Sequence, residues 1–358
     1  MIDKIILFPY YIVLKSRDIL YKKGKIESAK ASVPTICVGG ITVGGTGKTP
    51  FTEMVIRMLG ESPKWKERKL AVLSRGYKRK STGFQIVKED GSCSEYGDEP
   101  LQIKRKFPEM TVAVCRDRAE GAGILTSQEG AELIILDDAY QARELRASMN
   151  IVLVDYNRPI FKDMLLPMGE LRDLPERLYD ADIVVVTKCP TDLQDSERDE
   201  FAKGLGYKDY FLPSCYVTSK NGKRQLLLFA TTEYLPFKAL NDKTEPRFMY
   251  SNRLVMFSGI AKDTQLFDYL TGSYKILQRF VFPDHHQYSW ADLDRVSRTL
   301  LENPTACAVT TEKDAQRLPE SALKEEPLLS RLFIAPIRMR FLDAAEEVLF
   351  AEALEALS

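Results

Sequence analysis

The sequence predicts an α/β fold in which a mostly parallel sheet lies between layers of helices. Three observations predict it. An apolar, β-rich run at 33–38 leads into a glycine-rich loop and then into a helix with apolar periodicity. Further apolar runs alternate with helical segments along the chain. Nearly every such run ends in a polar or charged residue, at the edge where open parallel sheets bind ligands.

The glycine-rich loop matches the phosphate-binding pattern G-x-x-x-x-G-K-[ST] at every position except the first, where Thr42 replaces glycine. In such a loop the backbone N–H groups and the helix N-terminus converge on phosphate. The lysine reaches the outer phosphates, and the following hydroxyl can bind Mg²⁺. We therefore expect a nucleoside triphosphate to contact Thr42, Gly44, Gly45, Thr46, Gly47, Lys48 and Thr49.

A second strand, at 133–136, ends in the paired carboxylates Asp137 and Asp138. A phosphate-loop enzyme needs a carboxylate at the end of a neighbouring strand to hold Mg²⁺, so this pair supports the nucleotide site. The predicted fold is therefore a P-loop NTPase-type α/β/α sandwich, with a second, smaller α/β domain after it. We place the first domain at 1–215, a hairpin and linker at 216–248, and the smaller domain at 249–358, whose last helix is free to pack back on the first domain.

Other polar residues have two interpretations each. Asp98 and Glu99 begin a helix, where an acid stabilises the N-terminus, but the same loop falls between strands that end at the ligand edge. His285 and His286 are the only histidines and are poorly spaced for a metal. A loop histidine is more often structural, although it can also orient a catalytic carboxylate.

Composition limits the function classes. The formal net charge of zero gives no sign of nucleic-acid binding, and the six cysteines are scattered without metal spacing, which favours reduced thiols in the cytosol. No apolar run reaches the ~18–20 residues of a membrane-spanning helix.

The first thirty residues are apolar and basic, with seven Lys/Arg against three Asp/Glu. Ala29-Lys30-Ala31 is similar to a signal-peptide cleavage site, but the apolar stretch ends too early for one. An amphipathic helix in the membrane interface, begun or kinked near Pro9, fits better, and a helix packed on the sheet is the alternative.

In combination these motifs resemble the tetraacyldisaccharide 4'-kinase (lipid A 4'-kinase) family. The likeness extends over nearly the whole chain and rests on residues 40–50, 74–77, 97–100, Arg118, Asp137-Asp138 with Gln141, 157–159, 166–172, 258–261, 282–285 and 311–314. The threonine at position 42 is a feature of this family. One residue departs from it: Ala142 stands where the family usually has histidine after the glutamine.

The resemblance implies transfer of the γ-phosphoryl group of ATP to the 4'-hydroxyl of an acylated glucosamine disaccharide 1-phosphate, at the cytoplasmic face of the inner membrane. The enzyme is expected to be peripheral, without a spanning segment or cleaved signal, and no protein partner is implied. Asp98 is then the base, His285 orients it, and Lys48 holds the β/γ-phosphates. The resemblance further implies the following sets: Thr49, Glu99, Asp137 and Asp138 at Mg²⁺; Ser74, Arg75, Arg118 and Gln141 at the substrate.

The alternative is a membrane-associated P-loop switch ATPase or GTPase, or a metallochaperone. Such proteins share the loop and the paired aspartates. They should also carry metal-binding Cys/His residues or a base-specific N-K-x-D motif, of which 187–190 is only a partial match.

Overall fold

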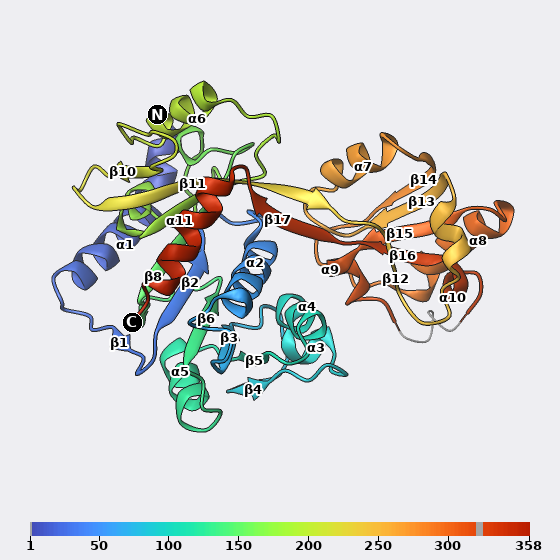
Figure 1. The fold of residues 1–358 in the computed structure, drawn as a ribbon, viewed down its shortest axis with the longest axis horizontal. Helices are drawn as coiled ribbons and strands as arrows, with labels where there is room; N and C mark the ends of the chain where they lie inside the picture. Colours follow the sequence, from blue (N-terminus) through green and yellow to red (C-terminus); the bar gives the residue numbers. More distant parts are fainter. Residues whose placement is uncertain (1, 320–324) are drawn as a thin grey trace. The chain divides into compact units, whose positions relative to one another are not determined.

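The computed structural model describes residues 2–319 and 325–358, and the chain forms two compact units (Figure 1). Unit 1 takes the chain up to Glu89, then Ile103–Thr232 and Met339–Ser358. Unit 2 takes Asp90–Gln102 and Glu233–Arg338. The sequence predicted boundaries near 215 and 248. The two units instead meet near 89, 102, 232 and 338. In particular, the segment that carries Asp98 is part of unit 2.

A 10-stranded sheet forms the centre of unit 1, in the order β10-β11-β9-β8-β2-β6-β3-β5-β4, with β17 beside β11. All neighbours from β11 to β5 are parallel, and antiparallel β10 and β4 border them. This confirms the predicted fold class. The strands are β2 (Thr35–Gly39), β3 (Leu70–Ser74), β4 (Gln85–Ile86), β5 (Thr111–Val114), β6 (Leu133–Asp137), β8 (Met149–Asp155), β9 (Ile183–Thr187), β10 (Tyr216–Thr218), β11 (Arg224–Tyr234) and β17 (Ile337–Phe341).

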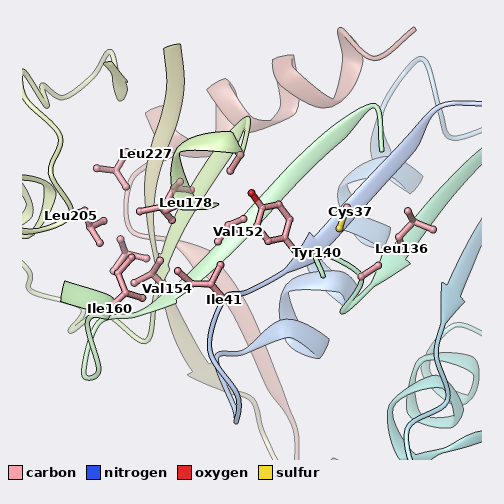
Figure 2. Packing of buried hydrophobic residues seen from close by; sticks show 14 of the residues in the cluster. Cys37, Ile41, Leu136, Tyr140, Val152, Val154, Ile160, Leu178, Leu205 and Leu227 are labelled. Carbon is pink, nitrogen blue, oxygen red and sulfur yellow. The ribbon is translucent and has the colours of Figure 1, made fainter. Parts of the chain in front are cut away.

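Helices cover both faces of this sheet. Alternate strand residues, among them Cys37, Leu136 and Val152, point into one large apolar cluster together with α5 (Arg118–Ser127) and α6 (Asp195–Gly204), as Figure 2 shows for part of it. On the other face α2 (Lys48–Glu61) packs on β2 and β6, and its Phe51 ring lies 5.6 Å from Phe350 of α11 (Ala344–Glu355). Two-sided burial explains why these strands are apolar throughout instead of alternating with polar residues.

Helix α1 (Ile2–Lys22) runs through Pro9 and has two different sides. On one side the Tyr10 hydroxyl donates to the Arg172 carbonyl at 2.9 Å, and Asp18 pairs with Arg143 at 2.9 Å. On the other side Phe8, Ile12 and Val13 are exposed to solvent. Among the helices of the described ranges, none is both long and apolar enough to span a bilayer.

Unit 2 is built on a five-stranded sheet in the order β12-β16-β15-β13-β14. Its strands are β12 (Lys238–Ala239), β13 (Arg253–Ser258), β14 (Lys275–Val281), β15 (Cys307–Thr311) and β16 (Leu332–Ala335). Val255 and Phe257 face the cluster beneath α8 (Trp290–Glu302), whereas Leu254 and Met256 face the cluster beneath α7 (Thr264–Thr271). Unit 2 is therefore also an α/β layer structure, with a parallel centre and one antiparallel edge strand.

The remaining elements are short. In unit 1 β1 (Ala29–Lys30) pairs with β7 (Leu145–Arg146), and η1 (Ile160–Lys162) and η2 (Pro175–Asp180) lie in the connections beside the sheet. Unit 2 adds α3 (Cys93–Tyr96), the first turn of α4 (Asp98–Lys106), η3 (Pro246–Tyr250), α9 (Glu312–Ala315) and α10 (Leu328–Arg331).

Candidate active site

The phosphate loop of unit 1 connects β2 to α2. Gly44 and Gly47 have φ values of 90° and 85°, in the left-handed region that favours glycine. Gly47 is also crowded, since a Cβ there would lie 2.8 Å from the Met339 Cε. Gly47 is the N-cap of α2, so the N-terminal N–H groups of that helix point into the loop. This backbone has the geometry that phosphate binding requires.

Two threonines shape the loop from inside. Thr42, in place of the usual glycine, is buried and forms a β-bridge with Leu171. Thr46 is also buried, and its carbonyl accepts a hydrogen bond of 2.8 Å from the Thr187 hydroxyl. Neither threonine Oγ1 has a hydrogen-bond partner among the described residues. Both residues therefore hold the backbone of the loop.

Lys48 lies at the start of α2 and faces the paired aspartates. Its Nζ is 3.3 Å from the Gly44 carbonyl and 3.8 Å from Asp138 Oδ2. Asp138 also pairs with Arg172, whose Nη1 is 3.1 Å from Oδ2. Burial alone would raise the pKa of Asp138, but the charges of Lys48 and Arg172 lower it. A carboxylate between two cations at this edge is ionised and ready to exchange them for a ligand.

The other aspartate of the pair is held more tightly. Asp137 ends β6, is buried, and accepts hydrogen bonds from Thr52 at 3.1 Å and Ser74 at 3.3 Å. Ser74, predicted at the substrate, thus contacts this carboxylate. The hydroxyl of Thr49 and the two carboxylates supply the hard oxygen donors that Mg²⁺ prefers, so the chemistry of the donor set fits the ion.

The other predicted metal ligand lies in unit 2 and has a cationic partner. Glu99 pairs with Lys313 at 2.9 Å. Both side chains are partly exposed, so this pair is open to exchange. Within the described residues, the structure places no three His, Cys, Asp or Glu side chains together as a metal cluster.

The predicted substrate residues other than Ser74 occupy different environments. Arg75 follows β3 and is exposed. Arg118 is almost completely buried at the start of α5, where its Nη1 donates to the Cys115 carbonyl at 2.5 Å. Gln141 donates from Nε2 to the Gly40 carbonyl at 2.6 Å and so supports the phosphate loop from behind. Ala142 is partly buried against the large apolar cluster of unit 1.

Unit 2 brings together the two residues predicted for proton transfer. His285 Nδ1 lies 2.9 Å from Asp98 Oδ2, although 187 positions separate the two residues. His285 has a φ of 62°, a left-handed conformation that is uncommon for a residue with a Cβ and is often found at functional sites. Burial acts to raise the pKa of Asp98, but the hydrogen bond from His285 and the charge of Arg317 hold it far below its usual value.

The neighbouring histidine has a structural role. His286 Nε2 is 2.9 Å from Asp292 Oδ2, and its ring stacks on Phe282 with centroids 4.6 Å apart. Asp292 accepts from the Ser289 N–H in the capping box of α8. The structure therefore separates the adjacent pair, with His285 at the carboxylate and His286 at a helix cap.

Sequence reasoning missed two arginines. Arg172 contacts both Asp138 and the Gly40 carbonyl, and Arg317 contacts Asp98. Arg172 ends the stretch 166–172, whose only signal in the sequence is the family resemblance. Arg317 follows the 311–314 motif by three residues, and a single arginine there carries no recognisable signal.

Comparisons with known proteins identify the family of this chain. The family model described as tetraacyldisaccharide-1-P 4'-kinase matches residues 5–355. A tetraacyldisaccharide 4'-kinase of Phocaeicola vulgatus is 37% identical over 93% of this chain and 88% of its own, and one of Flavobacterium johnsoniae is 36% identical over 94% and 93%. The crystal structure of LpxK from Aquifex aeolicus in complex with ATP is similar with a TM-score of 0.70 and 26% identity, covering 97% of this chain and 98% of that one. The chain belongs to the tetraacyldisaccharide-1-P 4'-kinase family.

Proposed function

We propose that this chain transfers the γ-phosphoryl group of ATP to the 4'-hydroxyl of tetraacyldisaccharide 1-phosphate, a step in lipid A biosynthesis. The observation that carries the proposal is a formed phosphate loop, with its lysine facing a strand-end carboxylate, in a chain that matches the family over residues 5–355. Phosphoryl transfer needs mainly positioning and neutralisation of charge, and the residues below supply both.

Unit 1 binds the nucleotide. The loop N–H groups and Lys48 hold the β- and γ-phosphates. Asp138 and its partner Arg172 lie next to Lys48. When ATP enters, Lys48 exchanges its contacts with Gly44 and Asp138 for phosphate oxygens, which are stronger partners for an ammonium group. The ion pair between Lys48 and Asp138 is long, at 3.8 Å, and exchanges at little cost.

Thr49, Asp137 and Asp138 are the groups of unit 1 that would hold Mg²⁺. The ion supplies charge neutralisation for the phosphates. Thr52 and Ser74 fix the orientation of Asp137 through the bonds described above. Asp138 is the more adaptable carboxylate, because its partners are the side chains of Lys48 and Arg172.

Unit 2 supplies the base that accepts the proton of the acceptor hydroxyl. Asp98 accepts the proton of the sugar hydroxyl, and His285 orients the carboxylate through Nδ1. As the first residue of α4, Asp98 also lies at the positive end of a helix, which favours its ionised form. Replacement of Asp98 by alanine should preserve ATP binding and abolish most turnover. Unchanged turnover would assign this carboxylate to helix capping alone.

The acceptor carries acyl chains, and we place the enzyme as a peripheral protein on the cytoplasmic face of the inner membrane. Support comes from the exposed apolar side of α1, with Phe8, Ile12 and Val13, and from the local excess of basic residues. Exposed Arg75 is then available for a phosphate of the lipid.

The test is a kinase assay. Purified protein with Mg²⁺ and [γ-³²P]ATP is incubated with tetraacyldisaccharide 1-phosphate in detergent micelles, and the lipid is separated by thin-layer chromatography. We expect labelled lipid in proportion to enzyme and time. A matched acceptor that lacks the free 4'-hydroxyl should remain unlabelled, and absence of label in the intact acceptor would contradict the proposed reaction.

A further inference from the structure

Arg317 is a charged side chain with no exposure to solvent. It follows α9 in unit 2, and its relative side-chain exposure is 0%. Placing a guanidinium in the interior is unfavourable unless its donors are paired, so the contacts of Arg317 decide whether the fold tolerates it. Because no part of the side chain reaches the surface, Arg317 cannot itself bind substrate in this conformation.

The front of the guanidinium is directed at the proposed base. Its Nε lies 2.7 Å and its Nη2 lies 2.6 Å from Asp98 Oδ2. His285 Nδ1 contacts the same oxygen at 2.9 Å and lies 3.3 Å from Nη2. One carboxylate oxygen therefore receives groups from two side chains, which fixes the carboxylate by more than the histidine alone.

The back of the guanidinium is held by the ends of two parallel strands. Its Nη1 donates to the Gly259 carbonyl at 2.9 Å, immediately after β13. It also lies 3.4 Å from Asp314 Oδ1 in α9, immediately after β15. Asp314 in turn accepts from the Gly259 N–H at 3.0 Å and the Thr311 hydroxyl at 2.7 Å. The guanidinium plane is thus set by the sheet and not by a flexible loop.

We propose that Arg317 is a positioning residue, which transmits the rigidity of the unit 2 sheet to Asp98 and fixes the direction in which that carboxylate meets the acceptor hydroxyl. The inference rests on the proposed role of Asp98 and extends it. A planar guanidinium suits this task because its Nε and Nη2 reach one carboxylate oxygen while its Nη1 contacts the strand ends, whereas an ammonium group supplies only a point charge. The burial of Arg317 separates its role from that of the exposed arginines, which are free to contact a lipid phosphate.

The alternative is that Arg317 only joins segments of unit 2 and supports folding. The two roles differ in a double-mutant cycle. A residue that acts through Asp98 has no effect on kcat once Asp98 no longer serves as base, whereas a residue that merely supports the fold lowers activity in either background.

The experiment uses the full chain as wild type, Arg317→Met, Arg317→Lys, Asp98→Asn and the Asp98→Asn/Arg317→Met double variant. For Arg317→Met we expect kcat to fall roughly 100-fold, the scale of general-base catalysis, with KM for ATP within about twofold of wild type. Arg317→Lys should recover about tenfold of this loss, because it restores the charge without the fork. In the Asp98→Asn background, Arg317→Met should change kcat by less than about threefold.

Arg279→Met is the matched control. Arg279 pairs with Asp263 in the same unit, with Nη2 2.5 Å from Oδ1, and its loss should leave kcat within about twofold. An Arg317→Met variant with wild-type kcat, or an equal loss of kcat in both backgrounds, would overturn the proposal. If Arg317→Met does not fold, Arg317→Lys alone in the two backgrounds decides by the same criterion. Failure of the proposed function gives a different result. The wild type would then make no product, or Asp98→Asn would have the same kcat as the wild type.

Discussion

Two carboxylates, Asp138 in unit 1 and Asp98 in unit 2, show how differently the two units prepare for catalysis. The Asp138 side chain is 35% exposed and pairs with Lys48 and Arg172, two long cationic side chains that a ligand can displace. The Asp98 side chain is 8% exposed and is fixed by a histidine and a buried arginine. Unit 1 thus presents groups that rearrange around a nucleotide, whereas unit 2 presents a carboxylate that is already oriented.

Despite this difference, the two units use the same architectural position. In unit 1 the phosphate loop follows β2, and the paired aspartates lie at the end of β6. In unit 2 Gly259 follows β13, and α9 with Asp314 follows β15. These are the carboxyl ends of parallel strands, where an α/β sheet leaves backbone groups and loop side chains free for function. The sharpest tests of the comparison therefore change one contact at a time at each edge.

The largest effect is expected at the phosphate loop of unit 1, where a ligand displaces the contacts of Lys48. Lys48→Ala removes the only side-chain cation that the phosphate-loop motif itself supplies, so ATP affinity should fall at least about tenfold and kcat more than about 100-fold. Isothermal titration with ATP and the kinase assay measure the two quantities. Lys203→Ala is the control, since Lys203 is exposed and pairs with Asp199 within α6. Wild-type affinity and product yield in Lys48→Ala would remove the nucleotide from this site.

A smaller effect, on turnover alone, is expected at the oriented carboxylate of unit 2, Asp98. His285→Gln should lower kcat about 10- to 100-fold with little change in ATP affinity, because it removes the ring that orients Asp98. His286→Gln is the adjacent control, and it should lower thermal stability modestly through the α8 cap while kcat stays within about twofold. The reverse ranking of the two variants would assign the catalytic role to His286.

The sequence was sufficient for the parts of this site that depend on local patterns. The glycine spacing before Lys48 and the aspartates at the end of an apolar run depend on contacts within one strand–loop–helix segment, and the structure has them where the pattern predicts them. The mostly parallel sheet also followed from the alternation of elements, whereas the order of its strands did not. Asp98 and His285, by contrast, came together only through the resemblance, because 187 positions separate them.

Other features depend on tertiary contacts that no local pattern encodes. Arg317 Nε lies 2.7 Å from Asp98 Oδ2, although 219 positions separate the two residues in the sequence. Ser74 and Gln141 were predicted to contact the substrate, yet their side chains hydrogen-bond to Asp137 and to the Gly40 carbonyl, at the nucleotide edge of the sheet. A polar residue after a strand therefore predicts the functional edge correctly, but its partner at that edge is decided by neighbours from other strands.

The exposed apolar side chains of α1 allow a test of membrane binding. Val13→Glu on α1 places a charge on the side proposed to enter the interface, and we expect binding to vesicles of phosphatidylethanolamine and phosphatidylglycerol to weaken by about tenfold. Val348→Glu on α11 is the matched control, since Val348 is similarly exposed at 56% against 63% for Val13. Equal sedimentation of both variants with vesicles would favour α1 as a helix that only packs on unit 1.

The smallest effect concerns a third carboxylate, which is buried and has no role in the proposed reaction. Glu346 in α11 accepts a hydrogen bond of 2.7 Å from the Phe229 N–H, and burial raises its pKa to about 7 despite Arg198 nearby at 3.8 Å. Since the folded chain holds this proton more tightly than the unfolded chain, with its ordinary pKa of 4.5, the stability it contributes is present below about pH 4.5 and is lost as pH rises through about 7.

Glu346→Gln removes that titration. Between pH 5 and pH 8 the wild type should therefore lose at least about 1 kcal/mol more of its free energy of unfolding than the variant does. Thermal unfolding of both proteins at each pH measures it, and titrations common to the two proteins cancel in the difference. The exposed neighbour supplies the control, since Glu347→Gln should leave the difference flat. A pH-independent difference for Glu346→Gln would mean that Arg198 keeps this carboxylate ionised throughout, as Arg317 does for Asp98.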